Sequence, residues 1–504
     1  MPNFWHIPEL VHLVVSFLSK SDQASFARVN RRLWLIAVLE IWRAVPDLRY
    51  FFLLLPADLC LWSSGSEVGE LSKPIFAACP LTLPPQSYPA SLRRQIHTSD
   101  YDRLIFHSRF TENLHYKVNK AIFGVPAEIW HHNTVSTAFP HLQSLHVSVN
   151  CWVTLWQIIM LSPFLQPTLR KLVFSSELDQ LSSTLRTIFE TRTLSLQELE
   201  LNCLRGVEEF VESARQAILS QRSLRRIRIY SLGDVTNLAY TAKELPCLTH
   251  FDVERLWSAP ESVSKRRDQE DGPERHFRSL VSLRVSGIPA GVTKLLESIT
   301  SNVITEIVAE LGDYRPGWMP PGALLALHAF KATLINLELQ IRGNFKWDLL
   351  EPVLGLDGLQ KFSLTYTTST ISPQVTDSRL LQMTQAWPRL TSLHLSNYSK
   401  TPTITLLGLG YIASNSQKLQ VLSVAFDGTR LVDPACLPVD DPPPEQSAME
   451  RVDVLHSRCK KGDELKITTS FFRRWWPRAR ITASDMLWGE EEEWERASAA
   501  SRTA

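Results

Sequence analysis

From about residue 140 onward, the chain repeats one pattern of hydrophobic and polar positions. The pattern is L-x-x-L-x-L or a close aliphatic variant, and the first positions of successive units lie 24 to 32 residues apart. The last two aliphatic residues of each unit alternate with a side chain that a β-strand would point to its other face. Each unit therefore predicts one short strand. The units are Leu142/Leu145/Val147, Leu169/Leu172/Phe174, Leu196/Leu199/Leu201, Leu224/Ile227/Ile229, Leu248/Phe251/Val253, Leu280/Leu283/Val285, the weaker Ile304/Ile307, Leu334/Leu337/Leu339, Leu359/Phe362/Leu364, Leu390/Leu393/Leu395, Leu419/Leu422/Val424 and Met449/Val452/Val454.

The segments between these predicted strands have a helical period. Apolar residues recur at helical spacing within 207–218, 292–299 and, more loosely, 380–387. Each strand-helix unit can bury its apolar face only against its neighbours, and the spacing is typical of leucine-rich repeats. We therefore predict an α/β fold with a curved leucine-rich-repeat-like solenoid of alternating strands and helices. A doubly wound α/β domain also alternates strands and helices, but it would need unusually many strands in one sheet.

The first 46 residues have a different pattern, that of a compact three-helix module. Proline lacks the N–H that stays unpaired in a first helical turn, and a carboxylate favours the positive helix end, so Pro8 and Glu9 predict a helix start. Ser21 or Asp22 offers a side-chain oxygen to cap a second helix, and a third helix is expected over 31–43. The apolar positions of the first helix recur at helical spacing and are Val11, Val14, Val15 and Leu18.

This module resembles the F-box. The family pattern opens with Leu-Pro and a carboxylate, continues with aliphatic residues at fixed helical offsets, and ends in Val-x-Arg or Val-Asn-Arg before an aromatic residue. One residue is missing here between the proline and the carboxylate, which changes the first turn. The alternative is a small helical cap that only buries its own core. The residues that fit the family pattern are Ile7-Pro8-Glu9, Val14-Val15, Leu18, Val29-Asn30-Arg31 and Trp34.

An F-box followed by irregular repeats resembles the substrate-receptor subunit of a Skp-cullin-F-box ubiquitin ligase. The arrangement is also similar to the expanded F-box family of basidiomycete fungi, in which the phrase 386–390, Ala-Trp-Pro-Arg-Leu, is familiar. The resemblance implies that the module binds a Skp-type adaptor and through it a cullin, that the repeats hold an unknown protein target, and that other subunits transfer ubiquitin. The chain itself would not be an enzyme. The expected adaptor-binding residues are Ile7, Pro8, Val11, Val14, Leu18, Val29 and Trp34, since a helix laid in a groove presents anchors at this spacing.

These patterns divide the chain into four expected parts. Lys73 to Pro89 carries five prolines and is expected to be extended. The segment 258–276 mixes basic and acidic residues and is expected to be a surface loop, in which Lys265-Arg266-Arg267 is either a nuclear import signal or a solvated basic run. The parts are an F-box over 1–46, a helical and Pro-rich linker region over 47–138, the solenoid over 139–488 and a disordered tail over 489–504.

Composition narrows the class of protein. A chain of 504 residues exceeds what one ordinary hydrophobic core serves, and a net charge of +1 gives no reason to expect nucleic acid or an anionic membrane as partner. The seven cysteines are scattered and form no C-x-x-C pair, which favours a reducing intracellular compartment, the cytoplasm or nucleus, over a disulfide framework or zinc site. No signal sequence is seen, and the strongest apolar run, 51–55, is far too short to span a bilayer.

The sequence lacks the common motifs for nucleotide binding, metal binding and nucleophilic catalysis, so we expect no cofactor. The sequence has no G-x-x-x-x-G-K, G-x-G-x-x-G, H-E-x-x-H or G-x-S-x-G, which leaves an enzyme on an α/β fold as the weakest hypothesis. His131-His132 lacks a third ligand at helical spacing and is either a polar loop pair or part of a metal site. The run 471–476 interleaves aromatic and basic residues. It is either part of a helix that caps the solenoid or a platform that binds nucleic acid.

The side chain between the last two aliphatic residues of each unit would point away from the core. Along successive units this position reads His146, Val173, Glu200, Arg228, Asp252 and Arg284, and the charge alternates through the last four. This pattern predicts either a ladder of ion pairs between strands or a polar platform for a protein target. A scaffold that binds the adaptor without ubiquitination is the alternative function. The expected target-binding residues are Arg226, Arg228, Tyr230, His250 and Glu254.

Overall fold

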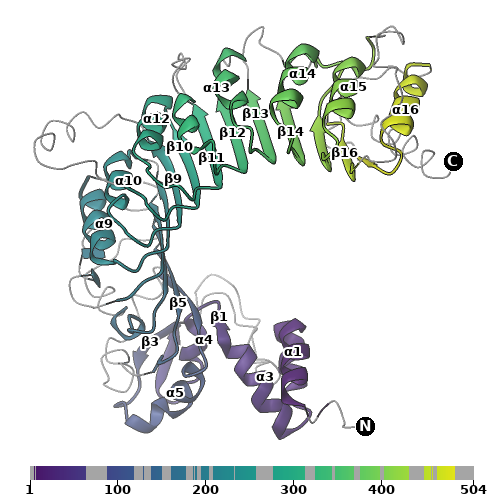
Figure 1. Cartoon of the computed structure of the whole chain (residues 1–504). Helices are drawn as coiled ribbons and strands as arrows, with labels where there is room; N and C mark the ends of the chain where they lie inside the picture. Colours follow the sequence, from purple (N-terminus) through teal and green to yellow (C-terminus); the bar gives the residue numbers. More distant parts are fainter. Residues whose placement is uncertain are drawn as a thin grey trace, which may run out of the picture. The chain divides into compact units, whose positions relative to one another are not determined.

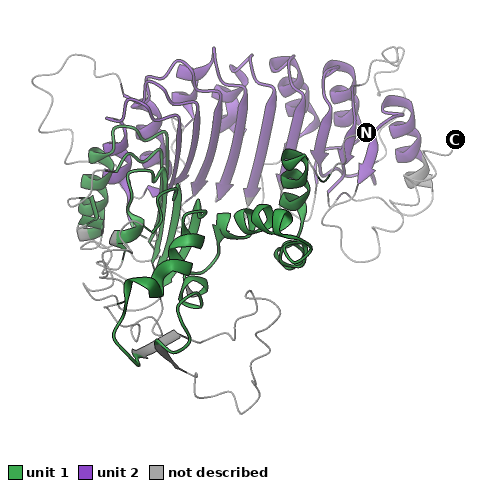
Figure 2. Ribbon diagram, turned by 90° about the horizontal axis from the view of Figure 1, so that it is seen from below, with its two compact units in different colours: residues 1–233 green, residues 234–504 purple. Residues whose placement is uncertain are grey.

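The computed structural model describes most of the chain and divides it into two compact units, residues 1–233 and 234–504 (Figure 2). The predicted surface loop over 258–276 (except residue 276), most of the Pro-rich segment, His131-His132 and the tail lie outside the described residues. The described residues are 5, 7–63, 88–118, 129, 138–149, 161–176, 185–186, 188–189, 194–203, 208–231, 233–256, 276–312, 324–342, 347–367, 375–397, 402–430, 448–455, 457 and 463–482.

Unit 1 begins with three helices and continues into parallel strands in the order β1-β4-β5-β6-β7-β8, beside a separate antiparallel pair, β2 and β3. Its helices are α1 (Pro8–Phe17), α2 (Lys20–Phe26), α3 (Arg31–Arg43), α4 (Arg49–Phe52), η2 (Thr98–Tyr101), α5 (Asp102–Ser108), η5 (Ser162–Phe164) and α9 (Glu208–Ser220). Its strands are β1 (Ala44–Val45), β2 (Cys60–Ser63), β3 (Tyr88–Leu92), β4 (Asn113–Val118), β5 (Ser144–Val149), β6 (Lys171–Ser176), β7 (Glu198–Cys203) and β8 (Arg226–Ser231).

Unit 2 continues the alternation, with parallel strands in sequence order from β9 to β17. Figure 1 shows α12, α13, α14 and α15 in a row on one side of these strands. The helices are α10 (Thr236–Ala242), α12 (Pro289–Glu297), η6 (Leu325–Phe330), η7 (Trp347–Leu350), α13 (Glu351–Leu354), α14 (Asp377–Ala386), α15 (Leu406–Asn415) and α16 (Asp463–Trp475). The strands are β9 (His250–Leu256), β10 (Ser282–Gly287), β11 (Glu306–Gly312), β12 (Asn336–Arg342), β13 (Lys361–Thr367), β14 (Ser392–Asn397), β15 (Val421–Val424), β16 (Arg451–Asp453) and β17 (Arg480–Thr482).

The aliphatic positions of the repeats set the strand register. Each repeat predicted from residue 140 onward contributes a strand, and its last two aliphatic side chains are buried. Both lie within the strand in every repeat except two, because Ile304 precedes β11 and Val454 follows β16. Equivalent positions of successive repeats are paired across neighbouring strands, so the buried side chains form continuous rows. Each CH₂ group that these rows remove from water stabilises the fold by about 0.8 kcal/mol. The α/β fold with parallel strands and intervening helices, repeated as in a solenoid, is therefore confirmed. The row through unit 1 is Leu145, Leu172, Leu199 and Ile227, and the row through unit 2 is Phe251, Leu283, Ile307, Leu337, Phe362, Leu393, Leu422, Val452 and Ile481.

The parallel strands extend beyond the twelve repeats that the pattern marks. β1 pairs with β4, and β4 pairs with β5, so parallel pairing begins well before residue 139. In β4, Leu114 and Tyr116 alternate as buried residues, but Phe110 precedes them by four residues and one buried position is aromatic, so the L-x-x-L-x-L pattern misses this strand. The cap of α2 also differs from expectation, because Ser19, rather than Ser21 or Asp22, accepts the backbone N–H of Asp22.

In unit 2, two consecutive helices are joined by a buried cap. The Asp377 carboxylate at the start of α14 accepts hydrogen bonds from the backbone N–H of Thr405 at 2.8 Å and from its hydroxyl at 2.7 Å. Thr405 in turn caps α15 by accepting the N–H of Leu407. Gly408 lies one turn later, where a Cβ atom would overlap the Asp377 carboxylate and touch Leu380 at 3.0 Å. Glycine is therefore required by the close approach of the two helices.

We predict that Gly408→Ala lowers the free energy of unfolding by about 1 to 3 kcal/mol, because the added methyl group forces α15 away from Asp377. The shift in urea midpoint measures this cost. The matched control is Gly358→Ala, whose Cβ would meet its nearest neighbour, the Leu334 carbonyl oxygen, at an ordinary 3.6 Å. The control should change stability by less than about 0.5 kcal/mol. Equal midpoints for the two variants would contradict the helix contact described above.

Candidate functional site

The N-terminal three helices form a small module with its own core. Val11 and Val15 of α1 pack against Leu33 and Ala37 of α3, with Phe26, Ala27 and Ile36 around them. The helix boundaries follow local chemistry. Pro8 opens α1, and the Asn30 side chain caps α3 by accepting the N–H groups of Arg32 at 3.0 Å and Leu33 at 2.9 Å. The predicted start near Pro8 and the predicted range of the third helix are confirmed.

A second apolar stripe of α1 faces away from this core. Leu10, Leu13 and Phe17 are 38%, 54% and 83% exposed, respectively. Their spacing of three and four residues places them on one helix face. Val29 and Leu35 add further exposed apolar surface to the same module. Clustered apolar side chains in water are a feature of docking sites rather than of ordinary surface, where exposed apolar residues occur singly.

The expected adaptor-binding residues divide between this surface and the core. Pro8, Val29 and Trp34 are exposed, whereas Ile7, Val14 and Leu18 are half-buried. Val11 is fully buried in the core of the module. Pattern reasoning missed Leu10, Leu13 and Phe17, because the apolar residues of α1 spread around most of the helix and the sequence does not show which side packs inward. The unusual width of the apolar arc was the available signal.

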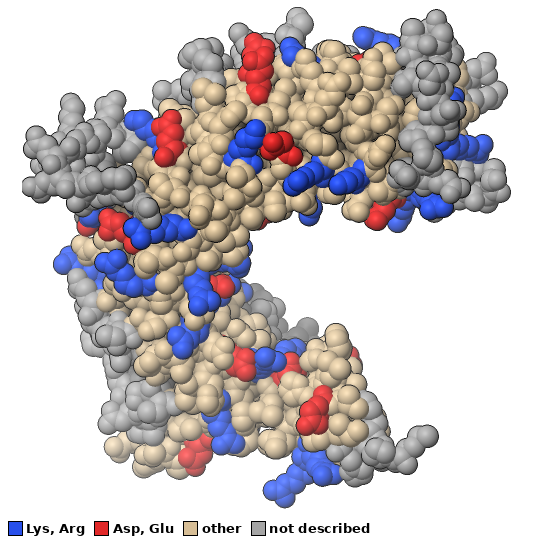
Figure 3. Space-filling model, in the orientation of Figure 1, with Lys and Arg blue, Asp and Glu red and all other residues tan. Residues whose placement is uncertain are grey.

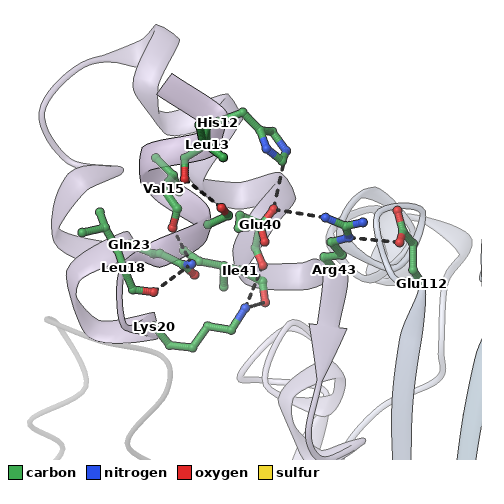
Figure 4. A network of polar contacts seen from close by, with 11 residues as sticks. His12, Leu13, Val15, Leu18, Lys20, Gln23, Glu40, Ile41, Arg43 and Glu112 are labelled. Carbon is green, nitrogen blue, oxygen red and sulfur yellow. Dashed lines mark hydrogen bonds and ion pairs between the residues drawn. The ribbon is translucent and has the colours of Figure 1, made fainter. Parts of the chain in front are cut away.

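A network of polar contacts holds the three helices together (Figure 4). The Gln23 amide donates to the carbonyl oxygens of Val15 at 2.9 Å and Leu18 at 3.2 Å, which ties α2 to the end of α1. The Lys20 ammonium donates to the carbonyls of Glu40 at 2.7 Å and Ile41 at 3.2 Å near the end of α3. A cation at this position satisfies carbonyls that the helix leaves unpaired. Burial lowers the pKa of Lys20, and the nearby Glu40 opposes that shift.

The same network joins the module to the first strands of unit 1. The Arg43 guanidinium lies 3.0 Å from the Glu112 carboxylate and 3.8 Å from Glu40, and His12 lies 3.5 Å from Glu40. The hydrogen bond to Glu112 raises the pKa of Arg43 further. The chain then passes from α3 directly into β1, where Ala44 is registered with Asn113 of β4. The module is therefore attached to the parallel strands without a flexible linker.

The expected target-binding residues of unit 1 lie on β8. Arg226, Arg228 and Tyr230 alternate along this strand and are half-buried. Arg228 lies 3.6 Å from Glu200 on β7, as a ladder of ion pairs predicts. Arg226 forms no ion pair within the described part of the chain, since its registered neighbour Glu198 lies 3.2 Å from Lys171 instead.

Two histidines stack on the same set of strands. The rings of His115 on β4 and His146 on β5 lie 4.0 Å apart and 3° from parallel. His115 shares a hydrogen bond of 3.1 Å with the Ser148 hydroxyl. Burial, followed by the neighbouring His146 and Lys117, lowers the pKa of His115 to about 4, and burial also lowers the pKa of His146. Both rings are therefore neutral at pH 7.

The other expected target-binding residues, His250 and Glu254, lie half-buried on β9 of unit 2. Burial, and then the neighbouring carboxylates of Asp252 and Glu310, raises the pKa of Glu254. Asp252 is registered with Arg284, which continues the alternation of charge in unit 2. The five expected residues thus belong to two units. Figure 3 shows basic and acidic side chains interspersed among uncharged ones.

The aromatic run near the C-terminus belongs to a helix that covers the end of unit 2. Phe471, Phe472, Trp475 and Trp476 are buried, and the Phe472 ring meets Phe426 edge-on at 6.0 Å. These contacts are those of a solenoid cap. Among the described residues, no three histidine, cysteine or carboxylate side chains come together as metal ligands, and no helix is long and apolar enough to cross a bilayer.

Comparison with known proteins does not place the chain in a family. No family model and no curated protein matches the chain. Among solved structures, the chain is similar to the crystal structure of a protein from Bacteroides fragilis, with 11% sequence identity, a TM-score of 0.26 and 75% coverage of each chain. A structural similarity this low supports no inference about function.

The histidine stack predicts a pH dependence of unit 1. The folded state lowers the pKa of His115 from 6.5 to about 4, so the unfolded chain binds the proton more tightly. Stability from this residue is complete above about pH 6.5 and is lost as the pH falls toward 4. We expect the free energy of unfolding of His115→Gln to fall by about 1 kcal/mol less than that of the native chain when the pH is lowered, a value reduced for the partial exposure of the ring. Urea midpoints of both proteins at pH 8 and pH 5 measure the difference. An unchanged pH dependence in the variant would refute this assignment.

Proposed function

We propose that this chain is the substrate-receptor subunit of a Skp-cullin-F-box ubiquitin ligase, whose N-terminal module binds a Skp-type adaptor and whose repeats bind a protein target. The observation that carries the proposal is the exposed apolar stripe of α1, Leu10, Leu13 and Phe17, on a module that already has a complete core. A helical cap that served only its own unit would not leave such residues in water. The quoted F-box pattern lies in the same helices.

The attachment of the module supports this division of labour. Arg43 and Glu112 connect the end of α3 to the start of β4, and β1 follows α3 without an intervening segment. A partner bound to α1 would therefore keep a fixed geometry to the strands of unit 1. A substrate receptor needs this property, because ubiquitin transfer requires the target to be held near the transferring subunit for as long as it is bound.

The proposed target surface in unit 1 is the side of β8 that carries Arg226, Arg228 and Tyr230. Arginine and tyrosine are the residue types most enriched at interface hot spots. The Arg226 guanidinium is half-exposed and has no carboxylate partner among the described residues, so it can pair with a target without first breaking an ion pair. Arg228 is already held by Glu200 and has a structural role as well.

The adaptor prediction concerns two residues of the exposed stripe. We expect Leu13→Ser together with Phe17→Ser to weaken binding of the purified Skp-type adaptor by at least about tenfold, because burial of each side chain is worth about 1.5 to 3 kcal/mol. Their exposure means that the module should stay folded. Isothermal titration calorimetry measures the affinity, and circular dichroism checks the fold.

The matched control for this prediction is Leu325→Ser, which removes a leucine of similar exposure, 57%, from η6 in unit 2. It should leave adaptor binding unchanged. If the double variant bound the adaptor as tightly as the native chain does, the proposed surface would be wrong. Adaptor binding without ubiquitin transfer in a reconstituted ligase would instead favour a scaffold.

The target prediction uses Arg226→Ala with Tyr230→Ala. We expect at least a fivefold loss of captured target from cells with blocked proteasomes, since hot-spot truncation costs about 1 kcal/mol or more. The melting temperature should fall by less than a few degrees. The control is Arg215→Ala on α9, whose guanidinium lies 3.3 Å from Glu212 on the same helix. A loss of stability with unchanged capture would leave these residues with a structural role alone.

A further inference from the structure

A compact group of aromatic rings and arginines lies where α3 of the N-terminal module meets α5. The Trp34 ring stacks on Phe106 at 6.0 Å, and Phe106 meets Phe110 edge-on at 5.3 Å. The Arg109 guanidinium carbon lies 4.3 Å from the centre of the Phe106 ring and 4.7 Å from that of Phe110. We call Trp34, Phe106, Arg109 and Phe110, with Arg103, the α3–α5 surface.

The cations of this surface are accessible. Arg103 and Arg109 are exposed, and neither forms an ion pair with a carboxylate within the described residues. Arg31 is also exposed and lies one helical turn before Trp34 on the same face of α3. Asp102, at the start of α5, is the exposed carboxylate of that helix. Arg103 and Arg109 both lower the pKa of His107, after the larger effect of burial, which places both charges in the neighbourhood of this ring.

The geometry suits an acidic, aromatic ligand. A guanidinium placed over an aromatic ring can still present N–H groups to a carboxylate, which accepts them as a bidentate pair. Exposed ring surface beside it, from Trp34 and Phe110, can take a further aromatic side chain. A peptide that carries several carboxylates and a tryptophan would therefore satisfy both parts of the α3–α5 surface, whereas a purely apolar helix would leave the arginines without a partner.

The chain itself contains such a segment. Residues 490–495 read Glu-Glu-Glu-Glu-Trp-Glu, which places five carboxylates around Trp494. This segment lies beyond residue 482, where the described residues end. Its charge is opposite to that of the arginines on the α3–α5 surface.

We propose that the α3–α5 surface binds the acidic segment Glu490–Glu495 of a second copy of this chain. The arginines pair with the glutamates, and Trp494 packs against the exposed rings. This binding goes beyond the proposed function and does not depend on it. Trp34 is also one of the residues expected to contact the adaptor, so the tail would compete with the adaptor if the proposed function holds.

The test uses the full chain with the five tail glutamates, residues 490–493 and 495, replaced by glutamine, so that no acidic tail competes with the added peptide for the surface. A fluorescent peptide of residues 488–497 is titrated with this protein, and its anisotropy is followed. We expect saturable binding that weakens with added salt, because the contacts are ion pairs. Arg103→Gln with Arg109→Gln should weaken binding by about fivefold to tenfold, and the melting temperature should stay close to that of the parent.

The matched control is Arg215→Gln with Arg222→Gln, which removes the same charge from exposed positions at and after α9. It should keep the affinity within about twofold. Equal losses in the two double variants would reduce the binding to general electrostatics and overturn the proposal. So would equal affinity for a peptide with glutamine in place of glutamate, a test that does not depend on the folding of any variant. No peptide binding, together with adaptor binding that Arg103→Gln and Arg109→Gln abolish, would assign the surface to the adaptor instead.

Discussion

The structure depends on one constraint, which is that each strand can bury its aliphatic row only against the rows of its neighbours. Leu145, Leu172 and Leu199 show this in unit 1, where the same repeat position faces itself from strand to strand. The side chains between these positions are thereby turned to the other face, which is polar at His146 and Glu200 and apolar at Val173. Stability and the candidate binding face thus arise from the same period of two residues.

The first and last strands have a neighbour on one side only, and different elements cover the two ends. At the N-terminal side, α3 runs into β1, and the Arg43–Glu112 ion pair fixes the junction at β4. At the C-terminal side, α16 places Phe471 and Phe472 over the last apolar layers of unit 2. A repeat without such covers would leave an apolar face in water. The N-terminal helices also carry the exposed apolar stripe of α1, which is the docking surface in the function that we propose.

Polar groups on the strand face and on the helical module behave differently. On the strands, Arg228 and Glu200 are already paired, and the stacked His115 and His146 are kept neutral by burial, so much of the polarity there is used internally. On the α3–α5 surface, Arg109 lies over the Phe106 and Phe110 rings, and neither Arg109 nor Arg103 is paired with a carboxylate of the described residues. We therefore assign to partners the charges that have no carboxylate partner among the described residues, and we assign a structural role to those already held in ion pairs.

The sequence by itself determined the alternation of strand and helix, the positions of the repeat strands and the helices of the first 43 residues, because hydrophobic period and capping residues act over short distances along the chain. It also marked Arg226 and Tyr230 as outward-facing. It could not show that Val11 is buried while Leu13 and Phe17 are exposed, since α1 is apolar around most of its circumference and only packing against α3 selects the inner side. It missed β4, where an aromatic residue and a shifted spacing hide the repeat. Only the tertiary structure brought Trp34 of α3 onto Phe106 of α5, because residues 72 positions apart in the chain meet only once the helices have packed.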